Sequence, residues 1–224
     1  MRIPQNFPLK PLALALLAIT APAAQAIDFS WTSGDFTVPG TAPSPLTVPD
    51  TLSINSGVAK RFNGTTFENQ SLVVWNTDDL GFGNGAQVKN AVSGVWDVKS
   101  NHVMNYFGGS NGTFTNNGVL RKSGGTGETR IDTIIVTSNG GTFEALTGNL
   151  RFNSAGGQTF NTGTVFTKGA GTGLNKITNN ATFNGTITSN NLEIAAGTSS
   201  SGGGGASLAG TLDYTGGDLS GTWT

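Results

Sequence analysis

The chain has 224 residues, a formal net charge of −1 and no cysteine. Without cysteine there are no disulfides or thiolate metal sites, and the near-neutral charge gives no electrostatic reason to expect a nucleic acid or an anionic lipid as partner. Charged residues make up 11% of the chain, against about 25% in ordinary globular proteins. The 34 glycines are about twice the usual share, yet 13 phenylalanines and regularly spaced aliphatic residues provide apolar surface for a core.

The first 26 residues are typical of a cleavable secretory signal peptide. Arg2 and Lys10 supply positive charge, an apolar run extends from Leu12 to Ile19, and Ala24 to Ala26 form a small-x-small cleavage pattern. The competing interpretation is a membrane anchor, but that needs about 20 apolar residues and this run is shorter. We therefore predict cleavage after Ala26, no membrane span in the mature chain, and an extracellular or outer cell-surface location.

Residues 27–50 differ in composition from the rest of the mature chain. They contain Trp31, Phe36 and a group of four prolines, Pro39, Pro43, Pro45 and Pro49. Stacked repeats leave unpaired strand edges at their ends, and natural repeat proteins cover these edges. We therefore expect residues 27–50 to be an N-terminal capping segment for the repeats that follow.

Residues 51–224 are repetitive. Superposing Phe114 on Phe160, 46 residues later, also aligns several other pairs: Val119 with Val165, Lys122 with Lys168, Gly125-Thr126-Gly127 with Gly171-Thr172-Gly173, and Ile131 with Ile177. Earlier in the chain, Val74-Trp75 recurs as Val95-Trp96, and Asn69 as Asn90, 21 residues later. Structural turns of 21 to 23 residues account for both offsets.

Each repeat contains short runs of alternating apolar residues separated by clusters of Gly, Asn, Thr and Ser, a pattern of strands and turns. Such runs are 118–121, 130–136, 149–152, 164–167 and 191–195. All are too short to form stable independent helices. The mature chain is therefore predicted to be all-β, either an antiparallel sandwich or a parallel β-helix.

Similarity at fixed offsets favours the β-helix, because stacked turns place equivalent residues about 4.8 Å apart. We predict a single-stranded parallel β-helix, or β-solenoid, of roughly eight coils of about 22 residues over Thr51–Thr224. Crossover chirality favours a right-handed coil. The stretch 216–224 stops in mid-pattern, so we expect the solenoid to be truncated at its C-terminus.

The segments Asn116–Gly127 and Gly210–Gly221 resemble the repeats of bacterial autotransporter passengers, filamentous-haemagglutinin-like adhesins and PEP-CTERM surface proteins. The resemblance covers most of residues 51–224. It implies a right-handed parallel β-helix displayed outside the cell, often as an adhesive or matrix component. No translocator barrel, anchor helix or sorting signal is recognisable in the sequence.

Asn76-Thr77-Asp78-Asp79 is the strongest catalytic candidate, because two neighbouring carboxylates can share acid and base roles in glycoside hydrolysis. Parallel β-helix polygalacturonases carry a similar Asn-Thr-Asp motif. Those enzymes also need a separate Asp pair, a Gly-His-Gly and an Arg-Ile-Lys, and this chain lacks all three. An Asp pair ahead of glycines is typical of an ordinary turn. We therefore predict no catalytic residues.

His102 is the only histidine, which excludes a multi-histidine metal site, and no nucleophile-elbow motif accompanies it. Five carboxylates are candidate calcium ligands, but none has EF-hand or nonapeptide-repeat spacing: Asp78, Asp79, Asp97, Glu128 and Asp132. The glycine-rich stretches 124–127 and 169–173 lack the context of phosphate-binding loops and are predicted to be corners. No metal or cofactor site is predicted.

Two further kinds of ligand are conceivable for a β-solenoid, ice and sugar rings. Ice-binding solenoids need Thr-x-Thr at every coil, whereas here Thr113-Phe-Thr115 and Thr186-Ile-Thr188 are isolated. Exposed Tyr106 or Trp223 would stack on sugar rings. The prediction is a non-enzymatic exported surface protein with a structural or adhesive role, whose partners are host or matrix polysaccharide or other surface proteins. The alternative is a carbohydrate-active β-helix, either a lyase or hydrolase or a carbohydrate-binding module.

Overall fold

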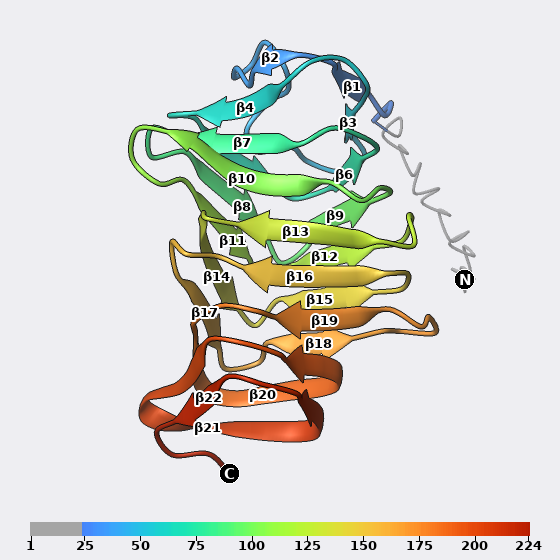
Figure 1. The fold of residues 1–224 in the computed structure, drawn as a ribbon. Helices are drawn as coiled ribbons and strands as arrows, with labels where there is room; N and C mark the ends of the chain where they lie inside the picture. Colours follow the sequence, from blue (N-terminus) through green and yellow to red (C-terminus); the bar gives the residue numbers. More distant parts are fainter. Residues whose placement is uncertain (1–23) are drawn as a thin grey trace, which may run out of the picture.

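The structure is a computed structural model that describes residues 24–224. The predicted signal peptide, Met1 to Ala26, lies outside the described residues except for its last three positions. The described chain contains 22 strands and no helix, and every strand pairing is parallel. The strands form a β-solenoid of about nine turns, which confirms the predicted fold (Figure 1).

Each regular turn contributes one strand to each of three faces, which we call A, B and C in chain order. Face A contains β1 (Asp28–Trp31), β3 (Thr51–Ile54), β6 (Leu72–Trp75), β9 (Val95–Val98), β12 (Val119–Lys122), β15 (Thr142–Ala145) and β18 (Val165–Thr167). Face B contains β2 (Gly34–Asp35), β4 (Lys60–Asn63), β7 (Leu80–Gly83), β10 (Val103–Gly108), β13 (Glu128–Asp132), β16 (Asn149–Asn153) and β19 (Leu174–Ile177). Face C contains β5 (Thr66–Asn69), β8 (Gln87–Asn90), β11 (Thr113–Asn116), β14 (Ile135–Asn139), β17 (Gln158–Asn161) and β22 (Asp218–Ser220).

The last two long strands, β20 (Ala181–Ile194) and β21 (Thr198–Tyr214), bend around the corners and take part in all three faces. In Figure 1 the face B strands lie in front and run from right to left while successive turns descend, so the coil is right-handed. The turn that begins at β1 lies above the eight turns that were predicted from residue 51 onwards.

The segment that was expected to cap the solenoid forms this outermost turn. Asp28–Trp31 pairs in register with Thr51–Ile54, and Leu46 bridges to Asn69. The rings of Trp31 and Phe36 are buried and lie 5.0 and 4.9 Å from the ring of Phe62. The outer turn thus extends the core as well as the sheet.

Alternation along the short strands fills the interior with apolar side chains. In β6, Val73 and Trp75 are fully buried, whereas the two residues between and before them are partly exposed. Two aromatic groups dominate the core: Trp31, Phe36, Phe62, Phe67, Phe82, Trp96 and Phe114 near the N-terminal end, and Phe143, Phe152, Phe160, Phe166 and Phe183 further along. Burial of each such side chain contributes about 1.5–3 kcal/mol.

Buried asparagines form a ladder of hydrogen bonds between successive turns at the corner after face C. Asn69 donates from Nδ2 to Asn90 Oδ1 at 2.8 Å, and Asn90 donates to Asn116 Oδ1 at 2.9 Å. All three side chains are fully buried. A Cβ on Gly94 would lie 2.4 Å from Asn90 Oδ1, so a glycine at this corner makes room for the ladder. The predicted stacking of Asn69 on Asn90 is confirmed.

Other predicted alignments need correction, because the turns differ in length. Val119 stacks on Thr142 and then Val165, as predicted. However, Val95-Trp96 lies beside Leu72-Val73 rather than beside Val74-Trp75. Phe114 lies beside Val136, which in turn pairs with Gln158, so the predicted match of Phe114 with Phe160 is wrong by two residues.

Residues 130–136 were predicted to form one strand, but the structure divides them between two strands. β13 ends at Asp132 and β14 begins at Ile135. Thr133 between them has a φ of 57°, in the left-handed region that threonine rarely adopts. The chain therefore turns a corner inside an apolar stretch that reads as continuous.

Candidate functional site

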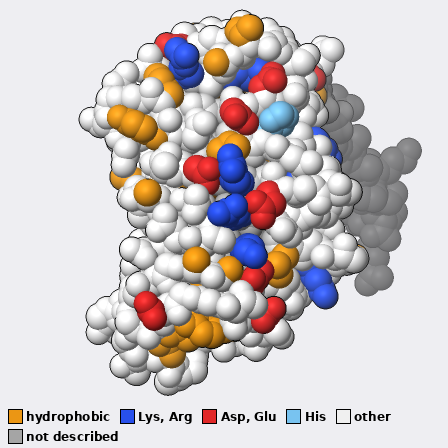
Figure 2. Space-filling model, viewed as in Figure 1, with side chains coloured by type: hydrophobic (Ala, Val, Ile, Leu, Met, Phe, Trp, Pro, Cys, Tyr) orange, Lys and Arg blue, Asp and Glu red, His pale blue; other side chains and the backbone are white. Residues whose placement is uncertain are grey.

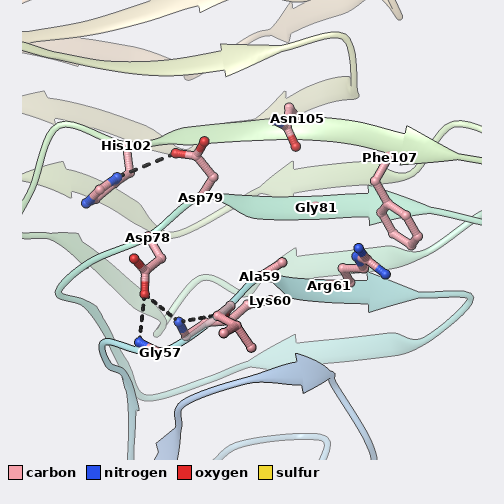
Figure 3. A pocket seen from close by; sticks show the side chains of 11 residues that line it. Gly57, Ala59, Lys60, Arg61, Asp78, Asp79, Gly81, His102, Asn105 and Phe107 are labelled. Atoms are coloured by element: carbon pink, nitrogen blue, oxygen red, sulfur yellow. Dashed lines mark hydrogen bonds and ion pairs between the residues drawn. The ribbon is translucent and has the colours of Figure 1, made fainter.

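One of the hollows on the described surface is a groove of about 460 Å³ on face B (Figure 3). It crosses β4, β7 and β10 and includes the corner that precedes each of these strands. Its lining residues are Gly57, Val58, Ala59, Lys60, Arg61, Asp78, Asp79, Gly81, His102, Asn105 and Phe107. The Asp78-Asp79 pair and His102, two separate candidates in the sequence, therefore lie in one place.

Asp78 is held at the corner between β6 and β7. Its φ is 66°, and the indole Nε1 of buried Trp75 donates to its carbonyl oxygen at 2.7 Å. Its carboxylate receives hydrogen bonds from Lys60 Nζ at 2.9 Å and from the backbone N–H of Gly57 at 3.1 Å. The hydrogen bond from Lys60 lowers the pKa of Asp78 below its ordinary value, and this effect outweighs the opposing effect of burial. Asp78 is therefore ionised at neutral pH.

Asp79 and His102 come together from corners on adjacent turns. The backbone N–H of Val103 donates to Asp79 Oδ1 at 2.9 Å, and His102 Nδ1 lies 3.5 Å from the same oxygen. On its other side, His102 Nε2 lies 3.4 Å from Thr77 Oγ1. The Asp79 side chain remains 55% exposed, so it can still accept hydrogen bonds from a ligand.

The opposite end of the groove is built around two glycines of β7. The ring of Phe107 covers them, because a Cβ on Gly81 would lie 2.9 Å from Phe107 Cδ1 and one on Gly83 would lie 2.9 Å from Phe107 Cε1. The guanidinium carbon of Arg61 lies 5.1 Å from the centre of the same ring, a cation–π arrangement. Figure 3 shows Arg61 and Phe107 at one end of the groove and the Asp78, Asp79 and His102 group at the other.

Arg61 forms no ion pair with any residue of the described chain, whereas Arg121, Arg130 and Arg151 do. Below the groove, Arg130, Arg151 and Lys176 occupy one register row of face B. Arg130 pairs with Asp132 at 3.4 Å, Arg151 with Glu128 at 3.2 Å and Lys176 with Glu193 at 3.2 Å. Figure 2 shows these mixed charges as a column down the front of the molecule.

The remaining carboxylates that were considered as calcium ligands are separate from the groove. Asp97 pairs with Lys99 at 2.7 Å, while Glu128 and Asp132 belong to the ion pairs of face B. Over residues 24–224, the structure places no three His, Asp or Glu side chains together as a metal site.

Face C has a different character. Thr115, Thr137, Thr159 and Thr182 follow one another in register on β11, β14, β17 and β20, and Ser200 continues the row. The row is built from single threonines that recur once per turn, and not from Thr-x-Thr pairs such as Thr113-Phe-Thr115. Tyr106 donates a hydrogen bond to Gly109 O, and Trp223 packs on Phe183 at 5.3 Å, so these two aromatics lie at different levels of the solenoid.

Sequence reasoning missed Lys60, Arg61, Gly81 and Phe107 as parts of the groove. The only signal was Gly81-Phe82-Gly83: the two glycines are the outward-facing residues of β7 on either side of the inward-facing Phe82, so this part of the strand has no outward side chain. Such a strand has space on its outer surface for another group. Comparison with protein-family models, curated proteins and solved structures gave no match. None of the described residues forms a helix with the length and apolar character needed to cross a membrane.

Proposed function

We propose that this chain is an exported bacterial surface protein with a structural or adhesive role and without catalytic activity. In this proposal the solenoid holds the groove on face B outside the cell, and the groove binds a polysaccharide of a host or of the surrounding matrix. The resemblance of its repeats to those of surface adhesins supports this role.

The ion pair between Asp78 and Lys60 supports the non-catalytic part of the proposal. Glycoside hydrolysis by two carboxyl groups requires one of them to be a protonated acid with a raised pKa. The pKa of Asp78 is lowered instead, and its carboxylate already accepts hydrogen bonds from Lys60 and Gly57. The ion pair thus suits Asp78 to stabilising the corner and disfavours it as the acid of such a pair.

The proposed export is supported by the chain around the predicted cleavage site. Residues 24–27 are exposed and belong to no strand, and the first strand begins at Asp28. A peptidase that cuts after Ala26 would therefore leave every described strand intact. Protease treatment of intact source cells tests the location: the chain should be digested without lysis, and protection until lysis would refute surface display.

The second candidate function is that of a carbohydrate-active enzyme, and one observation favours it. Asp79 Oδ1 and His102 Nδ1 lie 3.5 Å apart in the groove, a pairing that could move a proton. The purified chain should be incubated with a panel of neutral and acidic polysaccharides while reducing ends and unsaturated products are measured. We expect no release. Turnover that disappears in Asp79→Asn but persists in an Asp97→Asn control would establish the enzyme instead.

A further inference from the structure

We propose that the groove recognises a uronic acid unit of an acidic polysaccharide, with the sugar carboxylate on Arg61 and the sugar hydroxyls on Asp79, His102 and Asn105. This inference rests on the proposed binding function and specifies the class of ligand. It is carried by the unequal ends of the groove.

Arg61 is the cation in the groove that is free to bind a ligand. Its guanidinium lies 5.1 Å from the Phe107 ring centre and has no carboxylate partner within residues 24–224. Lys60, the other cation that lines the groove, is fully buried and already occupied by Asp78. A guanidinium that is oriented by an aromatic ring presents its planar fork of N–H donors, which matches a carboxylate in two parallel hydrogen bonds.

The opposite end of the groove rejects an anion. The charge of Asp78 is balanced there by Lys60 at 2.9 Å, whereas the Asp79 carboxylate is 55% exposed and has no lysine or arginine partner within residues 24–224. A ligand carboxylate at that end would be repelled, whereas hydroxyl groups could donate to Asp79 and exchange hydrogen bonds with the partly exposed His102 ring. An acidic sugar is therefore bound in one orientation, with its carboxylate towards Arg61.

Gly81 allows Arg61 and Phe107 to take their positions in the groove, because a Cβ there would come within 3.3 Å of Arg61 Cγ and 2.9 Å of the Phe107 ring. The groove volume of about 460 Å³ falls within the range of small-molecule sites, about 300–1,000 Å³. Shape and charge thus fit a short stretch of a sugar chain that carries one carboxylate at the Arg61 end.

The test uses trigalacturonate as the acidic probe and the matching neutral galactose trisaccharide as its control, with both affinities measured by calorimetry. Wild-type protein should bind trigalacturonate at least tenfold more tightly than the neutral trisaccharide. Arg61→Gln should remove this preference, while Arg61→Lys should retain part of it. Arg151→Gln, which changes an arginine of the same face outside the groove, should bind like wild type.

Equal affinity for the two trisaccharides, or an Arg61→Gln variant that retains the preference, would overturn the inference. Neither outcome affects the proposed function, which fails on different readouts: intracellular location or catalytic turnover. Arg61 is exposed, so its replacement should leave the fold unchanged, and a matching circular dichroism spectrum for Arg61→Gln verifies this.

Discussion

Replacing Asn90 with alanine should destabilise the solenoid by about 3 kcal/mol. The Asn90 side chain is fully buried and makes three hydrogen bonds: it accepts from Asn69 Nδ2 at 2.8 Å and donates to Asn116 Oδ1 at 2.9 Å and to Val119 O at 3.1 Å. Each bond contributes about 1 kcal/mol, and a partner that is left buried without a hydrogen bond costs about 1–3 kcal/mol. The loss therefore exceeds what an exposed polar contact contributes.

The matched control is Asn139→Ala, which removes an asparagine from an exposed ladder. Asn139 accepts from Asn161 Nδ2 at 2.6 Å, but both partners can bond to water after the substitution. Its effect should stay within about 0.5 kcal/mol. Guanidinium unfolding followed by tryptophan fluorescence and circular dichroism measures both variants. An Asn90→Ala loss no larger than that of Asn139→Ala would refute the role given to the buried ladder.

Three further predictions concern buried groups and the groove. Burial lowers the pKa of Lys122 from 10.5 to about 8, so the folded chain releases this proton at a lower pH than the unfolded chain. The free energy of unfolding should therefore rise as the pH is raised from about 8 to 10.5, by at most about 3 kcal/mol. The rise should be absent in Lys122→Met, and a pH profile identical to wild type would contradict this assignment. The pKa of Asp78 is lowered from 3.8, so the ionised Asp78 side chain stabilises the fold above that value. This contribution to the free energy of unfolding should be lost as the pH falls from 3.8 through the lowered pKa. Acid unfolding of Asp78→Asn should therefore depend less steeply on pH than that of wild type. Gly83→Ala should destabilise the chain more than Gly81→Ala, by about 1–3 kcal/mol. The new Cβ at position 83 would lie 2.4 Å from the backbone oxygen of Gly108, whereas the one at position 81 would meet the Phe107 ring, which can move. Equal thermal midpoints for the two variants would count against the packing described for β7.

The fold could be predicted because short alternating runs and glycine-rich corners leave few other arrangements for so weakly charged a chain. The register could be predicted only in part, because extra residues enter at different corners. Asn69 and Asn90 are 21 residues apart, whereas Asn90 and Asn116, one turn further on, are 26 apart. A single offset that aligns one face therefore misaligns another, as it did for Val95-Trp96 and Phe114.

The candidate site was only half visible in the sequence. The Asp78-Asp79 pair and His102 are recognisable because carboxylates and histidine carry chemistry, but nothing in the sequence joined His102 to the pair. His102 lies beside Thr77 because it follows 25 residues later, close to one full turn. Arg61 and Phe107 belong to no motif, and only the stacking of β4, β7 and β10 brings them together over Gly81.

His102 provides the most direct test that the groove binds sugar without cleaving it. It is the only histidine of the chain, so its imidazole signals in an NMR spectrum report on the groove alone. Titration with trigalacturonate should shift these signals to saturation while the sugar spectrum shows no new reducing-end or unsaturated signals. Unchanged imidazole signals at high sugar concentration, or the appearance of cleavage products, would contradict the account.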